Sequence, residues 1–213
     1  MFKQIFFWFF MFLILPVSLF AQITEDNYNR AYVYTQKGMY QDALKEYQSA
    51  LSQNPDKDME TRIRFNMSII YDNLDMKEES LNQLLKAIEI NPALFVLHLN
   101  LAHTYKDLGR NQEAITEFNK ALEIDSNYAD VYLIYYNLGH IYNKMANYEE
   151  AVKYLDKSLS LKPDHIGSMQ QLAYSNIGLK KFDDAEKILN KLESLNSPQK
   201  ELFEKLQNAK SQK

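Results

Sequence analysis

The chain contains no cysteine, so disulfides, thiolate metal ligands and cysteine nucleophiles are all excluded. Glycine and proline are scarce as well, with five of each in 213 residues, and so few helix breakers favour a largely helical chain. Positive charge is not in excess, because 24 Lys and Arg residues face 28 Asp and Glu residues. A formal net charge of -4 does not provide the basic surface that nucleic acid requires, so we expect no nucleic-acid partner.

A long apolar run occurs only at the N-terminus. Lys3 precedes the apolar residues 5–15, and Pro16 and a short stretch ending at Ala21 follow. This layout is typical of a secretory signal, so residues 1–21 are predicted to be a signal peptide that is cleaved after Ala21. The alternative is an uncleaved anchor, because residues 5–21 are 17 apolar or small residues, the short limit for spanning a bilayer. Both interpretations predict an exported protein, periplasmic or extracellular, that is either released or anchored to the inner membrane through this segment alone.

The rest of the chain repeats a pattern of small and large apolar residues. A small residue recurs with spacings of 37, 34, 37 and 34, at Ala43, Ser80, Ala114, Ala151 and Ala185. A large apolar residue follows each of them four places later, at Tyr47, Leu84, Phe118, Leu155 and Leu189. A second series of small residues precedes these, at Ala31, Ser68, Ala102, Gly139 and Ala173. Small side chains at fixed intervals allow helix axes to approach to about 8–10 Å, with the large neighbours filling the grooves beside them.

A period of about 34 residues built from two helices resembles the tetratricopeptide repeat family, and the resemblance covers residues 24–199. It implies an all-α fold, a right-handed α-solenoid of five helix-turn-helix repeats with a C-terminal capping helix. The five repeats are expected at residues 24–57, 61–94, 95–128, 132–165 and 166–199. Residues 200–213 are then the capping helix and tail, with Leu202, Phe203 and Leu206 facing inward.

The period alternates because three extra residues precede the second repeat (58–60) and the fourth (129–131). Three residues are nearly one helical turn. We therefore expect a longer first helix in the second and fourth repeats. The turn between the two helices carries a glycine only in the first and third repeats, at Gly38 and Gly109.

In the family that the chain resembles, first helices line a concave groove and the sixth residue of each repeat points into it. Here these residues are all primary amides: Asn29, Asn66, Asn100, Asn137 and Gln171. A carboxamide can donate to and accept from the same peptide unit, so a ladder of amides is suited to an extended peptide. The alternative is that these amides only cap helices or pack against the neighbouring repeat.

Aromatic, apolar and histidine side chains flank the amides on the same helices. They are Tyr28, Phe65, Leu99 and Tyr136 one place before the amide, and Tyr32, His103, His140 and Tyr174 three places after it. Such side chains are suitable anchors for a peptide, although each ring could equally be buried against the next helix. The family's clamp for a terminal carboxylate needs a lysine one place before the amide, and none is present there.

The sequence contains no recognisable catalytic motif, phosphate loop or dinucleotide fingerprint. His103 and His140 occupy equivalent positions, but zinc needs three or four ligands, so we expect no metal and no cofactor. The signal, the repeats and the cap leave no room for a catalytic domain, which makes a metal-dependent enzyme the weakest hypothesis. The leading hypothesis is an exported adaptor that binds a protein or peptide segment, extended or helical, in its groove. The alternative is a structural subunit of a cell-envelope assembly, held by its convex or edge surfaces.

Overall fold

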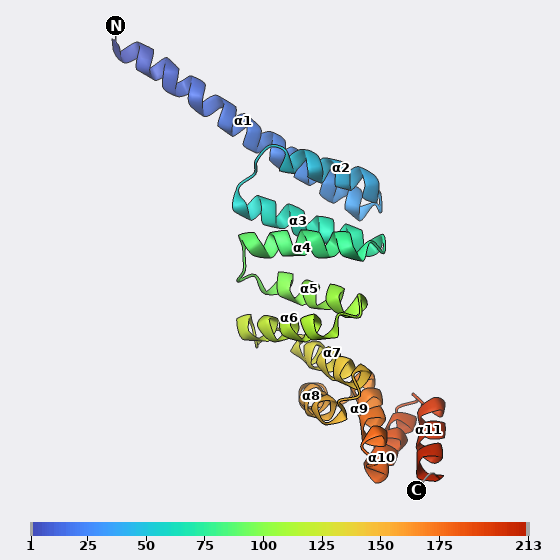
Figure 1. Cartoon of the computed structure of the whole chain (residues 1–213). Helices are drawn as coiled ribbons and strands as arrows, with labels where there is room; N and C mark the ends of the chain where they lie inside the picture. The colour runs from blue at the N-terminus through green and yellow to red at the C-terminus, as the bar shows by residue number, and fades with distance from the viewer. Residues whose placement is uncertain (1, 212–213) are drawn as a thin grey trace. The chain divides into compact units, whose positions relative to one another are not determined.

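The computed structural model describes the backbone of residues 2–211 and the side chains of residues 19–211. This part of the chain forms eleven α-helices and no strand (Figure 1). The helices are α1 (Phe2–Gln36), α2 (Tyr40–Leu51), α3 (Lys57–Asn73), α4 (Lys77–Ile90), α5 (Phe95–Asp107), α6 (Asn111–Ile124), α7 (Val131–Lys144), α8 (Tyr148–Leu161), α9 (Ile166–Gly178), α10 (Phe182–Ser194) and α11 (Lys200–Ser211). The all-α solenoid of paired helices is as predicted.

The N-terminal segment that we interpret as an export signal is only partly described. The side chains of its basic start and its apolar run lie outside the described residues. Among the described residues, no helix is both long and apolar enough to cross a membrane.

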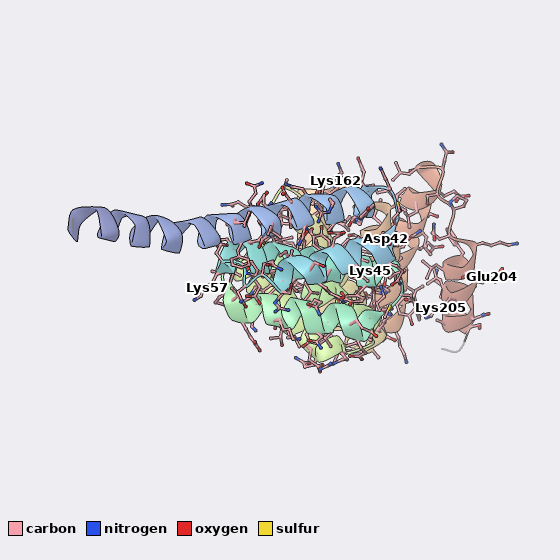
Figure 2. All side chains as sticks on the ribbon, turned by 90° about the horizontal axis from the view of Figure 1, so that it is seen from above. Asp42, Lys45, Lys57, Lys162, Glu204 and Lys205 are labelled. Atoms are coloured by element: carbon pink, nitrogen blue, oxygen red, sulfur yellow. The ribbon has the colours of Figure 1, made fainter. Side chains whose placement is uncertain are left out.

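The chain divides into two compact bodies, residues 1–108 and residues 109–213, which we call the N-terminal body and the C-terminal body. In the N-terminal body, α1 pairs with α2 and α3 with α4, while α2 contacts α3 and α4 contacts α5. In the C-terminal body, α7 pairs with α8 and α9 with α10, while α8 contacts α9 and α11 covers α9 and α10. The second helices expose charged residues; Asp42 and Lys45 on α2, for example, form an ion pair of 3.8 Å (Figure 2).

The repeated small and large residues form the core, as their spacing predicts. All five small residues of the second helices are fully buried, and so are the five large apolar residues that follow them. The contacts at Gly139 show how close the helices are, because a Cβ atom there would lie 2.5 Å from Leu155 Cγ and 3.2 Å from the Ala151 carbonyl oxygen. Close approach of α7 and α8 is thus the physical reason for the small residue at this position.

The turn between the two helices of each repeat has the same backbone conformation in all five repeats. One residue takes a positive φ at Gly38 (72°), Asp75 (58°), Gly109 (74°), Ala146 (56°) and Lys180 (59°). These positions repeat the spacings of 37, 34, 37 and 34, so the period is visible in the backbone as well as in the side chains. Non-glycine residues accept the left-handed conformation here at a cost of about 1 kcal/mol each, so the turn does not require glycine.

The prediction of a longer first helix is confirmed for the second repeat and is wrong for the fourth. The helix α3 has 17 residues, whereas α7 has 14 and α5 and α9 have 13 each. The Asp56 side chain caps α3 by accepting a hydrogen bond of 2.8 Å from the Met59 backbone N–H, which allows the helix to begin at Lys57. Before α7, residues 129–130 stay in a turn, and Asp130 makes no side-chain cap.

The C-terminal helix α11 covers the last repeat, as predicted. Leu206 is fully buried, and Leu202 and Phe203 are partly buried against the core of α9 and α10. Lys210 on α11 also forms an ion pair of 2.7 Å with Glu186 on α10. Since a solenoid exposes the apolar face of its last repeat, this helix closes the core at the C-terminal end.

Candidate binding surface

The first helices of the N-terminal body bring two predicted groove residues, Tyr28 and Asn66, into contact. Tyr28 of α1 is only 8% exposed, and its ring meets Tyr47 of α2 edge-on at a centroid distance of 5.7 Å. Asn66 Nδ2 on α3 donates a hydrogen bond of 3.0 Å to the Tyr28 hydroxyl oxygen. The guanidinium carbon of Arg62, also on α3, lies 4.5 Å from the centroid of the Tyr28 ring. Sequence reasoning identified Tyr28 and Asn66 but missed Arg62.

The other predicted residues of the N-terminal body vary in their accessibility. Tyr32 is 48% exposed, and Asn29 is exposed and donates a long hydrogen bond of 3.5 Å to Glu25. Asn100 is partly buried and its Nδ2 donates to the Val96 carbonyl oxygen of its own helix at 2.8 Å. The remaining three, Phe65, Leu99 and His103, are partly buried.

Burial changes the acid–base properties of two residues in this body. It lowers the pKa of His103 to about 4, because desolvation disfavours the imidazolium, and nearby Lys106 adds to the effect. Burial likewise raises the pKa of Tyr47 to about 12. The Tyr47 hydroxyl is buried near Thr35 and Asn66, yet within the described part of the chain it makes no hydrogen bond of normal geometry.

In the C-terminal body, the predicted amides are involved in packing. Asn137 is only 7% exposed, and its Nδ2 donates to the Leu133 carbonyl oxygen at 2.8 Å. Gln171 is held by Asn143 of α7, whose Nδ2 donates to its Oε1 at 3.0 Å and to its carbonyl oxygen at 2.9 Å. Ser175 Oγ in turn donates to Asn143 Oδ1 at 2.7 Å. Asn143 therefore joins α7 to α9, a role that its position in the repeat does not reveal.

The predicted aromatic and histidine positions of this body are partly buried. Tyr136 lies between His140, at a ring distance of 6.3 Å, and His165, at 5.1 Å. Burial lowers the pKa of His165, and its Nδ1 accepts a hydrogen bond of 3.2 Å from the Ser168 backbone N–H. Tyr174 is covered by α11, because the ammonium of Lys205 lies 3.5 Å from the centre of its ring.

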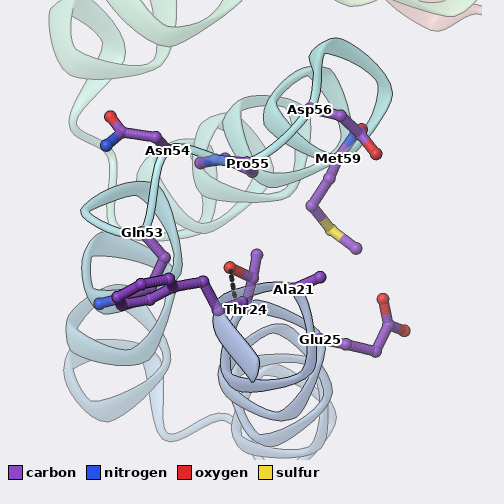
Figure 3. A pocket seen from close by; sticks show the side chains of 9 residues that line it. Ala21, Thr24, Glu25, Gln53, Asn54, Pro55, Asp56 and Met59 are labelled. Atoms are coloured by element: carbon purple, nitrogen blue, oxygen red, sulfur yellow. Dashed lines mark hydrogen bonds between the residues drawn. The ribbon is translucent and has the colours of Figure 1, made fainter. Parts of the chain in front are cut away.

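A pocket opens at the end of the N-terminal body, where α1 meets the connection from α2 to α3 (Figure 3). It has a volume of about 560 Å³. Its walls combine apolar side chains with two carboxylates, and its lining includes Phe20, Ala21, Glu25, Pro55, Asp56 and Met59. The pocket thus adjoins the peptide bond at which the signal is predicted to be cleaved.

Comparisons with known proteins agree with the repeat pattern. Residues 25–57, 61–94 and 94–162 match family models described as Tetratricopeptide repeat. No curated protein sequence matches the chain.

Solved structures of similar fold are numerous but distant in sequence. A tetratricopeptide repeat protein from Parabacteroides merdae superposes with a TM-score of 0.77 at 21% identity, over 88% of this chain and 72% of that one. PilW, a widely conserved type IV pilus biogenesis factor, gives 0.69 at 22% identity, over 89% and 87% of the two chains. YrrB, which has an unusual peptide-binding site, gives 0.60 at 24% identity, over 69% and 73%. Identities this low establish a shared fold and nothing more specific.

Proposed function

Because the chain belongs to the tetratricopeptide repeat family, we propose that it is an adaptor that binds a segment of another protein along the first helices of its N-terminal body. Proteins of this fold bind protein or peptide partners, and YrrB is one solved example with a peptide-binding site. The proposal assigns the protein a binding role and no catalytic step.

The observation that carries this proposal is the set of accessible groups around Tyr28. Tyr32 exposes about half of its surface, Asn66 is partly exposed, and Arg62 is exposed beside them. Exposed aromatic and arginine side chains are the groups most enriched at the centres of protein interfaces. In the C-terminal body Asn137 is buried, Gln171 is bound by Asn143 and the ammonium of Lys205 lies over the Tyr174 ring, which favours the N-terminal body as the binding region.

We propose further that the protein is exported and that its signal is cleaved after Ala21. Among the described side chains of α1, those from Leu19 to Ile23 are exposed and Thr24 is the first to pack into the body, which supports a mature chain that begins before Thr24. A helix that starts at Gln22 would carry Glu25 in its first turn, where a carboxylate stabilises a helix. Its length would match that of the other first helices.

Site-specific photo-crosslinking in cells tests the binding proposal. A photoreactive residue at Tyr32 on α1 should capture one dominant partner, whereas the same residue at exposed Lys45 on α2 should not. The control replaces Asn66 with Ala, which should reduce capture from Tyr32. Capture from Lys45 alone would contradict the proposal and support a structural subunit held by its outer surface.

The mass of the protein isolated from cell fractions tests export and cleavage. The expected product lacks residues 1–21, begins at Gln22 and is found outside the cytoplasm. A full-length chain in the membrane fraction would support the anchor instead. A full-length chain in the cytoplasm would contradict export.

A further inference from the structure

We propose that Arg62 and Asn66 form a subsite that binds the carboxylate side chain of an aspartate or glutamate within the partner segment. This inference rests on the proposed function, because it specifies one chemical feature of the segment that the N-terminal body binds. The two side chains lie one turn apart on the same face of α3 and both contact Tyr28 of α1.

Among the residues with described side chains, the other three arginines each form an ion pair with an acidic residue, and Arg62 does not. Arg30 pairs with Glu46 at 3.0 Å, Arg110 pairs with Glu113 at 3.0 Å, and Arg64 pairs with Glu60. Among the residues with described side chains, Arg62 has no carboxylate within ion-pair distance. Glu25 lies on the same stretch of α1 as Tyr28. Its carboxylate accepts a hydrogen bond from Asn29 and does not pair with Arg62.

The guanidinium of Arg62 is already positioned for a ligand. It lies over the face of Tyr28, whose ring is supported edge-on by Tyr47 and whose hydroxyl is fixed by Asn66. Stacking on one face of a guanidinium leaves its in-plane N–H groups free, and these match the two oxygens of a carboxylate. A side chain held in place before binding loses little entropy when the ligand arrives, which raises the affinity of such a subsite.

Asn66 adds a second polar group beside the guanidinium. One N–H of its amide donates to the Tyr28 hydroxyl, the Tyr47 hydroxyl lies close to the same amide, and Asn66 remains partly exposed. The part of this amide that remains exposed can donate to the same carboxylate that Arg62 binds.

The position of the subsite favours an acidic side chain over a chain terminus. Of the three first helices in the N-terminal body, α3 is the middle one along the chain, between α1 and α5. A segment that follows the first helices therefore continues past Arg62 in both directions. At the position of Arg62, the other repeats have Glu25, Val96, Leu133 and Gly167, so this cation occurs once and fixes the register of the segment.

Selection from a library of displayed random peptides tests the subsite. The library consists of 12-residue peptides between fixed flanks, so that no free terminus is presented, and the bait is the purified protein. The expected consensus contains an aspartate or glutamate at one fixed position. Replacing that residue by its amide should weaken binding by about tenfold, a typical effect of losing a charge-assisted hydrogen bond.

Two variants of α3 show which arginine is responsible. In Arg62→Gln the acid-to-amide change should alter affinity by less than about twofold, because the partner of the carboxylate is gone. In the matched control Arg64→Gln, which removes the same charge two residues away, the tenfold difference should persist. Circular dichroism confirms that both variants are folded.

The outcomes separate this inference from the proposed function. A consensus without an acidic residue overturns the subsite and leaves peptide binding intact. An acidic consensus whose acid-to-amide effect is unchanged in Arg62→Gln also overturns it. A library that yields no binder overturns the subsite together with the proposed function.

Discussion

The first helices of the two bodies carry primary amides at the same repeat position, but Asn66 of the N-terminal body makes different contacts from Asn137 and Gln171 of the C-terminal body. In the N-terminal body, Asn66 donates to the Tyr28 hydroxyl beside the exposed Arg62, whereas Asn100 donates to a carbonyl of its own helix. In the C-terminal body, Asn137 is buried and Gln171 is bound by Asn143. A residue's place in the repeat therefore determines the helix face it occupies, while the neighbouring side chains determine whether it can bind anything else.

The largest effect expected from this comparison is on stability in the C-terminal body. Asn143 is 5% exposed and makes three hydrogen bonds to α9, so Asn143→Ala should lower the free energy of unfolding by about 3 kcal/mol. Asn66→Ala removes one hydrogen bond at a partly exposed site and should cost less than about 1 kcal/mol. Urea denaturation of the two variants measures both values. Similar losses would mean that the two amides have the same structural role.

The second effect concerns acid stability and depends on His103 of the N-terminal body. Its folded pKa of about 4 lies below the usual value of 6.5, so between these values the unfolded chain binds a proton that the folded chain does not. The contribution of neutral His103 to the free energy of unfolding is therefore complete above pH 6.5 and is lost as the pH falls toward 4. At pH 5 the loss is about 2 kcal/mol relative to neutral pH.

Urea titrations at pH 7 and pH 5 isolate this contribution when wild type is compared with His103→Gln. The wild type should lose about 2 kcal/mol more than the variant, since other titrating groups are common to both. An equal loss in the two proteins would show that His103 is accessible to protons in the folded state.

The periodic part of the fold could be predicted from the sequence because it depends on side-chain size. Ala114 and Phe118 are fully buried, as their repeat positions require, and the same is true of their equivalents in every repeat. The capping helix was predictable for the same reason, because Leu202 and Leu206 have the spacing of an apolar helix face. The length of the first helix in the fourth repeat could not be predicted, because an extension depends on a single capping side chain. Asp56 caps α3 in the second repeat, whereas Asp130 does not cap α7.

The properties of the candidate site could be predicted only in part. Tyr28 and Asn66 were identified by their positions in the repeat, but their contact with each other joins residues 38 positions apart. Arg62 gives no signal in the sequence, because its lack of an ion pair among the described side chains depends on side-chain geometry that the sequence does not show. Likewise, nothing in the sequence indicates that Lys205 of α11 covers Tyr174. Such pairings depend on tertiary geometry that the period does not encode.

A smaller effect, of opposite sign, is expected at Tyr47. The C-terminal body has Leu155 and Leu189 at the equivalent positions, whereas Tyr47 buries a hydroxyl group without a normal hydrogen bond in the described structure. Tyr47→Phe should therefore raise the free energy of unfolding by about 1 kcal/mol. Tyr32→Phe is the matched control, because the Tyr32 side chain is 48% exposed and its hydroxyl should contribute little. A loss of stability in Tyr47→Phe would show that Thr35, Asn66 or a buried water molecule satisfies the hydroxyl.

The smallest effect tests whether α11 is what closes the C-terminal face. Lys205 is exposed and contacts the ring of Tyr174 through its ammonium, an interaction worth about 0.5–1 kcal/mol at such a site. Lys205→Ala should lower the free energy of unfolding by no more than that amount. The control is Lys187→Ala, which removes an exposed lysine that pairs with Asp184 and should have no measurable effect. Packing of α11 as a whole is expected to close the C-terminal face. Lys205→Ala should therefore bind the peptides selected from the library with the same affinity as wild type. An increase in the affinity for these peptides would show that Tyr174 belongs to a second binding region that α11 blocks. The difference in accessibility between the two bodies would then come from the position of α11.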